Sequence, residues 1–201
     1  MASPTARGAG TVRARRIVLF ARPGAGKSTQ AALLATRLGV PHLSTGALLR
    51  DEVVSGSALG QLIAPVLERG DLVEDELVVP VVAQHLEAAA AAGGYVLDGF
   101  PRDLAQDTAL AAKFPDAVQP QIAVLLDVPA EECRRRLLAR ASSEGRSDDT
   151  PQTIDHRLAL FDTDLLPVIE RYEQRGLLVR VDGEADRRVV TERILDRLGT
   201  P

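Results

Sequence analysis

The sequence predicts an α/β fold in which a parallel sheet of five strands is flanked by helices. Five short apolar runs alternate along the chain with segments that have helical spacing of apolar residues. Strands that alternate with helices are joined by crossover connections and therefore run parallel. Of the 201 residues, 45% are hydrophobic and 26% are charged, which is typical of a folded domain and excludes a mainly disordered chain. We expect one domain over residues 16–201, preceded by a flexible tail over residues 1–15.

The predicted elements follow one another in a simple order. The strands are expected at Ile17–Phe20, Pro41–Leu43, Tyr95–Asp98, Ile122–Asp127 and Leu178–Val181. The helices are expected at Ser28–Leu38, in two parts within Leu48–Leu67, from Asp75 to Ala92, and at Leu104–Lys113, Pro129–Arg140, Gln152–Arg175 and Arg187–Leu198. Gly39 ends the first helix, and Pro167 is expected to interrupt the long helical stretch that contains it.

Composition excludes several classes of function. The net charge of −4 gives no basic field for general binding of nucleic acid, and the apolar runs are too short to span a bilayer. One cysteine, Cys133, allows neither a disulfide framework nor a four-cysteine zinc site within one chain. The N-terminus lacks the apolar stretch of a secretory signal. We therefore expect a cytoplasmic protein that uses no zinc and binds neither nucleic acid nor membrane.

A glycine-rich segment, Ala21–Thr29, directly follows the first predicted strand. It matches the phosphate-loop pattern G-x-x-x-x-G-K-[ST], except that Ala21 replaces the first glycine. Gly24 and Gly26 let the backbone turn its N–H groups toward phosphate oxygens, and the next helix adds its positive end. The motif predicts nucleotide binding on a P-loop NTPase-type sheet.

Two side-chain features of this loop bear on chemistry. Lys27, one of two lysines in the chain, would place its charge on the β and γ phosphates, and Ser28 or Thr29 would bind magnesium. If Ala21 has a positive φ, its Cβ costs about 1 kcal/mol; if φ is negative, the replacement is tolerated. The sequence leaves both alternatives open.

Four motifs, in this order, resemble those of adenylate kinases and related nucleoside-monophosphate kinases. They are Pro23–Gln30, Leu43–Gly46 followed by Leu49–Arg50, Gly70–Val73, and Asp98–Arg102 with Gln106. The resemblance runs from about Ile17 to the C-terminus and implies a reversible, magnesium-dependent transfer of the ATP γ-phosphate to AMP, giving two ADP. The alternatives are the same transfer to UMP or CMP, and a nucleotide-binding kinase-like protein with weak turnover, which Ala21 and Ala47 suggest. Thr45 and Gln106 favour adenine.

The resemblance also implies which residues bind each substrate. For ATP it implies Gly24, Ala25, Gly26, Lys27, Ser28, Thr29, Arg136, Arg140 and Ala185. For AMP it implies Thr45, Arg50, Leu72, Val73, Gly99, Phe100, Pro101, Arg102, Gln106, Arg146 and Arg157. The catalytic set is Lys27, Arg102, Arg140, Arg146 and Arg157, and Asp98 would hold magnesium through water. The residue chemistry agrees, because guanidinium groups grip phosphates through paired N–H groups and the transition state spreads charge over phosphate oxygens.

Two segments contribute no strand and are expected to move as units. By resemblance, residues 44–73 form the segment that binds the monophosphate, and residues 140–150 form a short lid. The short lid leaves no room for the metal-binding insert of larger relatives. Arg134 and Arg135 are interpreted as a solvated helix face, and His42, His85 and His156 as structural, since an ionised phosphate acceptor needs no base. We expect a monomer whose partners are ATP and AMP.

Overall fold

A computed structural model of the chain describes residues 15–68, 73–144 and 150–199. Its centre is a sheet of five parallel strands in the order β2-β3-β1-β4-β5. The strands are β1 (Arg16–Ala21), β2 (His42–Ser44), β3 (Tyr95–Asp98), β4 (Ile122–Asp127) and β5 (Leu178–Asp182). The predicted fold class is confirmed, and each predicted strand lies within one or two residues of its observed bounds.

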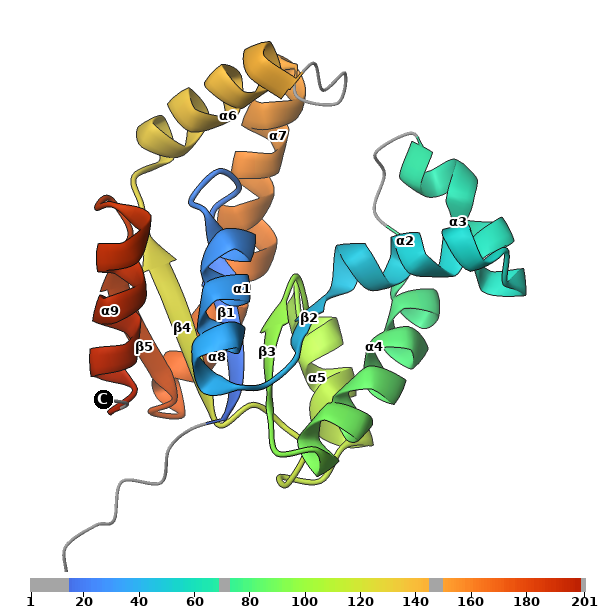
Figure 1. Ribbon diagram of the computed structural model, residues 1–201. Coiled ribbons are helices and arrows are strands. Elements are labelled where there is room, and N and C mark those ends of the chain that lie inside the picture. The colour runs from blue at the N-terminus through green and yellow to red at the C-terminus, as the bar shows by residue number, and fades with distance from the viewer. Residues whose placement is uncertain (1–14, 69–72, 145–149, 200–201) are drawn as a thin grey trace, which may run out of the picture.

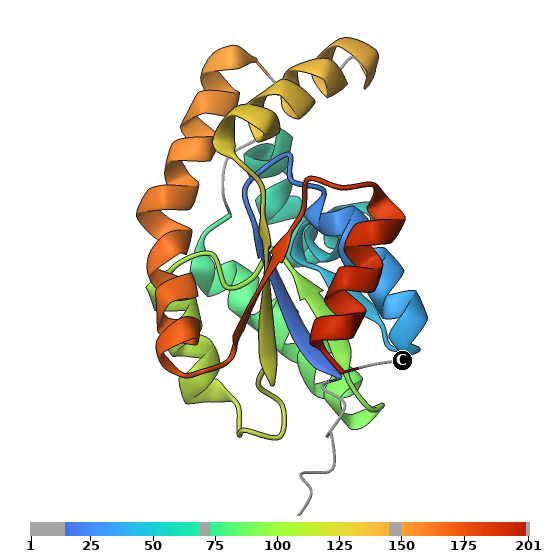
Figure 2. The same ribbon diagram turned by 90° about the vertical axis from the view of Figure 1, so that its left-hand side faces the viewer.

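Helices cover both faces of this sheet (Figure 1). In chain order they are α1 (Lys27–Leu38), α2 (Thr45–Ser55), α3 (Ala58–Glu68), α4 (Asp75–Ala91), α5 (Leu104–Lys113), α6 (Ala130–Glu144), α7 (Pro151–Leu160), the π-helical turn η1 (Phe161–Leu165), α8 (Leu166–Gln174) and α9 (Arg187–Arg197). Figure 2 shows α1 and α9 on one face, with α5 and α8 on the other.

The central strand β1 explains how two cores arise from one apolar run. Successive strand residues point to opposite faces, so a strand buried on both sides must be apolar throughout. Ile17 and Leu19 join the core under α1 and α9, whereas Val18 and Phe20 join the core under α4, α5 and α8. This double burial fixes the position of the loop that follows β1.

Helix α6 continues further than the sequence analysis predicted. It was expected to end at Arg140, but it runs to Glu144, so the predicted lid over 140–150 begins inside a helix. The physical reason is that alanine, serine and glutamate after Arg140 are all tolerated in a helix, and the first helix-breaking residue is Gly145. Residues 145–149 lie outside the described chain.

The long helical stretch is interrupted earlier than predicted. The break is the π-helical turn η1, which ends before the proline. Pro167 lies in the first turn of α8, directly after η1, and has no N–H to donate to the turn before it. The predicted interruption is thus present, but it lies at Phe161–Leu165 rather than at Pro167 itself.

Two pairs of helices extend beyond the sheet at the carboxyl ends of its strands. Figure 1 shows α2 and α3 on the β2 side, and α6 with the adjoining end of α7 on the opposite side. Gly56, with φ of 68°, separates α2 from α3, which are the two helical parts expected within Leu48–Leu67; the first begins earlier than expected, at Thr45. These pairs contain the described parts of segments 44–73 and 140–150, whose movement as units stays a prediction; residues 1–14 of the predicted tail lie outside the described chain.

Candidate active site

The predicted site residues follow the carboxyl ends of neighbouring strands. The phosphate loop follows β1, Thr45 follows β2, and Asp98 ends β3. Because β2, β3 and β1 are adjacent and parallel, these three points meet at one edge of the sheet. Ligands of such sheets bind at that edge.

Backbone geometry agrees with the glycine pattern of the phosphate loop. Gly24 and Gly26 have φ of 86° and 89°, values that favour glycine, and α1 begins immediately afterwards at Lys27. A Cβ on Gly24 would also lie 2.6 Å from the Cys133 carbonyl oxygen. Cys133 is buried.

Ala21 is the last residue of β1, and no described residue other than glycine has a positive φ. Its side chain is 3% exposed and belongs to the core under α1 and α9. The alternative in which this alanine strains the loop is therefore wrong. The weak-turnover hypothesis loses the support that it drew from this position.

A charged cluster lies where the phosphate loop meets the end of β3. Lys27 Nζ contacts Asp98 Oδ1, and Asp98 is only 2% exposed. His42 Nε2 lies 3.6 Å from the other carboxylate oxygen of Asp98. Sequence reasoning did not place His42 beside Asp98, because a histidine shortly before a Ser-Thr-Gly motif matches no metal-site or catalytic-triad pattern.

Burial and like charges depress the pKa values in this cluster. Desolvation, with the charge of Arg102 acting in the same direction, lowers the pKa of Lys27 to about 8. Desolvation and the charge of Lys27 lower the pKa of His42, so His42 is neutral at neutral pH. Burial lowers the pKa of Arg102; Asp75 opposes this shift, and Arg157 adds to it. Lys27 and Arg157 thus each lie close enough to Arg102 to interact with its charge, an arrangement that suits an anionic ligand beside them.

The turn after β3 is held by hydrogen bonds within the chain. Arg102 Nε donates to the Gly99 carbonyl at 3.0 Å, and the Arg102 main-chain N–H donates to Gln106 Oε1 at 2.8 Å. Gln106 Nε2 donates to Asp75 Oδ1 at 2.5 Å. Phe100 and Pro101 are buried beside this turn. Asp75 is the first residue of α4, after the N-cap residue Glu74, and its carboxylate accepts from Gln106.

Two residues predicted to bind AMP carry polar groups without partners in the described chain. Thr45 is 1% exposed, and its hydroxyl makes no hydrogen bond. Arg50, on α2, is exposed, and its guanidinium makes neither a hydrogen bond nor an ion pair. Val73 is buried in the core beside α4. Leu72 and Arg146 lie outside the described residues.

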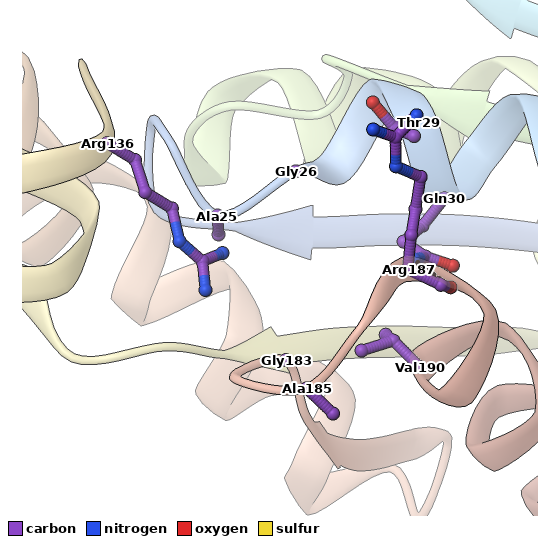
Figure 3. A pocket seen from close by; sticks show the side chains of 9 residues that line it. All are labelled: Ala25, Gly26, Thr29, Gln30, Arg136, Gly183, Ala185, Arg187 and Val190. Carbon is purple, nitrogen blue, oxygen red and sulfur yellow. Dashed lines mark hydrogen bonds between the residues drawn. The ribbon is translucent and has the colours of Figure 1, made fainter. Parts of the chain in front are cut away.

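A cavity of about 290 Å³ lies between the phosphate loop, the start of α1 and the loop that follows β5 (Figure 3). It is lined by Ala25, Gly26, Thr29, Gln30, Arg136, Gly183, Ala185, Arg187 and Val190. Five of these nine were predicted to bind ATP: Ala25, Gly26, Thr29, Arg136 and Ala185. Sequence reasoning missed Gln30, Gly183, Arg187 and Val190. The order of the predicted strands could have pointed to two of them, because residues 183–187 follow the carboxyl end of β5, where ligands of such sheets bind.

The arginines of α6 have different partners. Arg134 donates to Asp155 of α7 at 2.6 Å and Arg135 to Glu132 at 2.7 Å, both at the surface, as expected for a solvated face. Arg136 reaches the cavity while its Nε donates to Glu132 at 2.7 Å. Arg140 lies on the same helix, one turn further along.

Comparison with known proteins agrees with this geometry. The adenylate kinase family model matches residues 19–177, which is most of the chain. The chain belongs to the adenylate kinase family.

Similar members of the family come from Xanthomonas and Xylella. The adenylate kinase of Xanthomonas campestris pv. campestris (strain 8004) is 46% identical over 185 residues, which cover 92% of this chain and 99% of that protein. The adenylate kinases of Xanthomonas oryzae pv. oryzae (strain MAFF 311018) and Xylella fastidiosa (strain 9a5c) are 45% and 42% identical over the same shares. Family membership, first suggested by the four motifs, is confirmed. Among the described residues, no helix is long and apolar enough to cross a membrane.

Proposed function

We propose that this chain transfers the γ-phosphate of ATP to AMP, reversibly giving two ADP. The family and the names of the relatives support this reaction and give no support to the pyrimidine alternative. The observation that carries the proposal is the cluster of Lys27, Asp98 and Arg102, which joins the phosphate loop to the turn after β3. That cluster lies between a cavity on one side and the residues expected to bind AMP on the other.

The donor nucleotide would occupy the cavity and the phosphate loop. Its base and ribose would lie in this cavity beside Arg136 and Ala185. Its phosphates would receive N–H groups from Gly24 to Thr29 and the charge of Lys27. Lys27, with a pKa of about 8, carries that charge at neutral pH.

The acceptor would bind against α2 and the turn after β3. Arg50 and Arg102 would hold its phosphate through paired N–H groups, and the buried Thr45 hydroxyl would gain a partner from the ligand. Gln106 has one amide hydrogen and one oxygen lone pair beyond its bonds to Asp75 and Arg102. Gln106 would use this remaining hydrogen and lone pair to hydrogen-bond to the edge of the adenine ring.

The chemical step needs positioning and charge rather than a base. An oxygen of the AMP phosphate attacks the γ-phosphorus, and the bond from that phosphorus to the β–γ bridging oxygen breaks, leaving ADP on both sides. The attacking oxygen is already ionised, and the neutral His42 is not required as a proton acceptor. Lys27, Arg102, Arg140 and Arg157, together with Arg146, would neutralise the charge that develops on the transferred group.

The residues present fit a magnesium ion held mainly by the nucleotide. Magnesium prefers oxygen ligands, and it binds through one or two carboxylates, substrate phosphates and retained waters. The exposed Ser28 and Thr29 begin α1, and the Asp98 carboxylate lies beside the phosphate loop. No group of three or more acidic, histidine or cysteine side chains gathers within the described residues, so the phosphates would supply most ligands. When bound, magnesium would offset phosphate charge.

The test is a diphosphate assay with purified protein, ATP and magnesium, and AMP, UMP or CMP supplied separately. ADP formation that requires AMP is the expected result. UDP or CDP formation at a comparable rate would contradict the acceptor assignment. Tight ATP binding without turnover on any acceptor would contradict the enzyme assignment. A monomeric state and a cytoplasmic location stay predictions, which size-exclusion chromatography and cell fractionation would test.

A further inference from the structure

The donor cavity is positively charged on two sides. Its lining includes two arginines and no acidic residue (Figure 3). The Arg136 side chain enters from α6, and the Arg187 side chain extends from the start of α9 toward α1, where Thr29 and Gln30 line the same cavity. A cavity with two cations and no anion favours an anionic ligand.

The two arginines differ in what already neutralises them. Arg136 donates to the Glu132 carboxylate at 2.7 Å, so part of its charge is offset within the protein. Within the described chain, the Arg187 guanidinium makes neither a hydrogen bond nor an ion pair. Arg187 is therefore the lining residue whose charge is open to a ligand.

The backbone of Arg187 is nevertheless held firmly. Its carbonyl oxygen accepts from Gln30 Nε2 at 2.9 Å, and the Thr191 hydroxyl lies 2.9 Å from the same oxygen and 2.7 Å from Gln30 Oε1. Gln30 and Thr191 are each 4% exposed. A buried and satisfied polar network of this kind is rigid, and it joins the helix after the phosphate loop to the first residue of α9. We call these three residues the α1–α9 clamp.

Nothing in the fold itself gains from a cation at this position. Arg187 is the first residue of α9, and a positive charge near a helix N-terminus is opposed by the helix dipole. Its neighbour Arg188 has the same charge in the same turn, is also exposed, and does not line the cavity. Arg188 therefore provides a matched control for every effect of charge that does not involve the cavity.

We propose that Arg187 is a nucleotide-binding residue of the donor site and contacts the α-phosphate of ATP. The inference rests on the proposed function, since it takes the cavity as the ATP site. Thr29, at the start of α1, lines the cavity where it adjoins the phosphate loop, so a cation extending toward α1 meets the phosphate end of the nucleotide. The clamp holds the carbonyl of Arg187 and leaves its guanidinium to the ligand.

The test measures ATP affinity and separate KM values for the two substrates in wild type, Arg187→Ala, Arg187→Lys and Arg188→Ala. We expect Arg187→Ala to weaken ATP binding by about five- to tenfold, with Arg187→Lys in between and Arg188→Ala within about twofold of wild type. The KM for AMP should stay unchanged. The loss should shrink at high ionic strength, because an exposed charge is screened by salt.

Three results separate the outcomes. Equal affinities in Arg187→Ala and Arg188→Ala would overturn the proposal while leaving the proposed function in place. A loss that salt does not reduce would overturn the α-phosphate contact. Absence of ATP binding by the wild-type protein would instead contradict the proposed function. Thermal unfolding of each variant checks that the fold is retained.

Discussion

The donor and acceptor sides of the site are completed in different ways. On the donor side, Gln30 Nε2 donates to the Arg187 carbonyl, and the Thr191 hydroxyl lies within donating distance of that carbonyl and of Gln30 Oε1. The buried polar groups between α1 and α9 therefore find partners within the protein. On the acceptor side, the buried Thr45 hydroxyl has no partner in the described chain. A buried polar group without a partner costs free energy, and a ligand that supplies the partner recovers it. The polar groups that line the donor side are thus satisfied before ATP binds, whereas the Thr45 hydroxyl on the acceptor side gains its partner from the ligand.

The helices that carry the donor side are also packed more extensively on the sheet than those that carry the acceptor side. Most of the cavity lining comes from the phosphate loop, α1, the loop after β5 and α9, and both of these helices pack directly on the sheet (Figure 2); Arg136 alone comes from α6. The acceptor helices α2 and α3 extend beyond the sheet and reach the core through Leu49, Ile63 and a few neighbours (Figure 1). Elements with fewer buried contacts open at lower free energy. This suggests that substitutions on the acceptor side affect substrate binding and local stability together.

The largest expected effect belongs to the residue that both sides share. Lys27→Met removes the charge that faces the transferred phosphate, and we expect turnover to fall by about 10²–10³-fold while the fold is retained. Steady-state kinetics and circular dichroism would measure both. Lys113→Met is the matched control, because it removes the other lysine of the chain, which is exposed on α5. Activity of Lys27→Met within a few-fold of wild type would contradict the assignment.

Gln106→Ala should damage the acceptor side alone. It deletes the hydrogen bonds to Asp75 and to the Arg102 N–H, so we expect unfolding free energy to drop by about 1–3 kcal/mol. The KM for AMP should rise several-fold with the KM for ATP nearly unchanged. Equal increases in both KM values would show that Gln106 acts only through the fold.

Thr45→Val, also on the acceptor side, is expected to affect AMP binding without the loss of stability predicted for Gln106→Ala. It removes a hydroxyl that has no protein partner, so stability should hold or rise slightly while the KM for AMP still rises. Together, the two variants separate loss of a protein contact from loss of a ligand contact. Loss of stability in Thr45→Val would show that the hydroxyl has a structural partner.

Sequence reasoning succeeded where a signal is local. The bounds of β3, α5 and β4 were predicted to the residue, because each is an apolar run or helical repeat bounded by glycine, proline or aspartate. The phosphate loop was found for the same reason. What a local pattern cannot show is pairing across the chain. Gln106 meets Asp75 from 31 positions away, and Gln30 meets Arg187 from 157.

The lowered pKa of Lys27 predicts a pH dependence that is specific to the shared cluster. Between its folded pKa of about 8 and the ordinary lysine pKa of 10.5, the unfolded chain binds more protons than the folded one. Stability from this group should therefore rise with pH across that window, by about 1–3 kcal/mol in total. The measurement is the difference in unfolding free energy between wild type and Lys27→Met at several pH values from 7.5 to about 10.5. A difference that stays flat would show that the Lys27 pKa is not lowered.

The smallest expected effect is on the donor side, at Ala21. Ala21→Gly restores the glycine of the general phosphate-loop pattern, yet this residue closes β1, pairs with Leu126 of β4 and is buried with a negative φ. Glycine would relieve no strain; it would remove a buried methyl group and add freedom to the unfolded chain, at a cost of roughly 0.5–1 kcal/mol in stability. Both KM values and kcat should stay within about twofold of wild type, because the N–H groups that face phosphate belong to later residues of the loop. A several-fold fall in the KM for ATP would show that Ala21 does limit nucleotide binding, and that the donor side is less complete without its ligand than the α1–α9 clamp indicates.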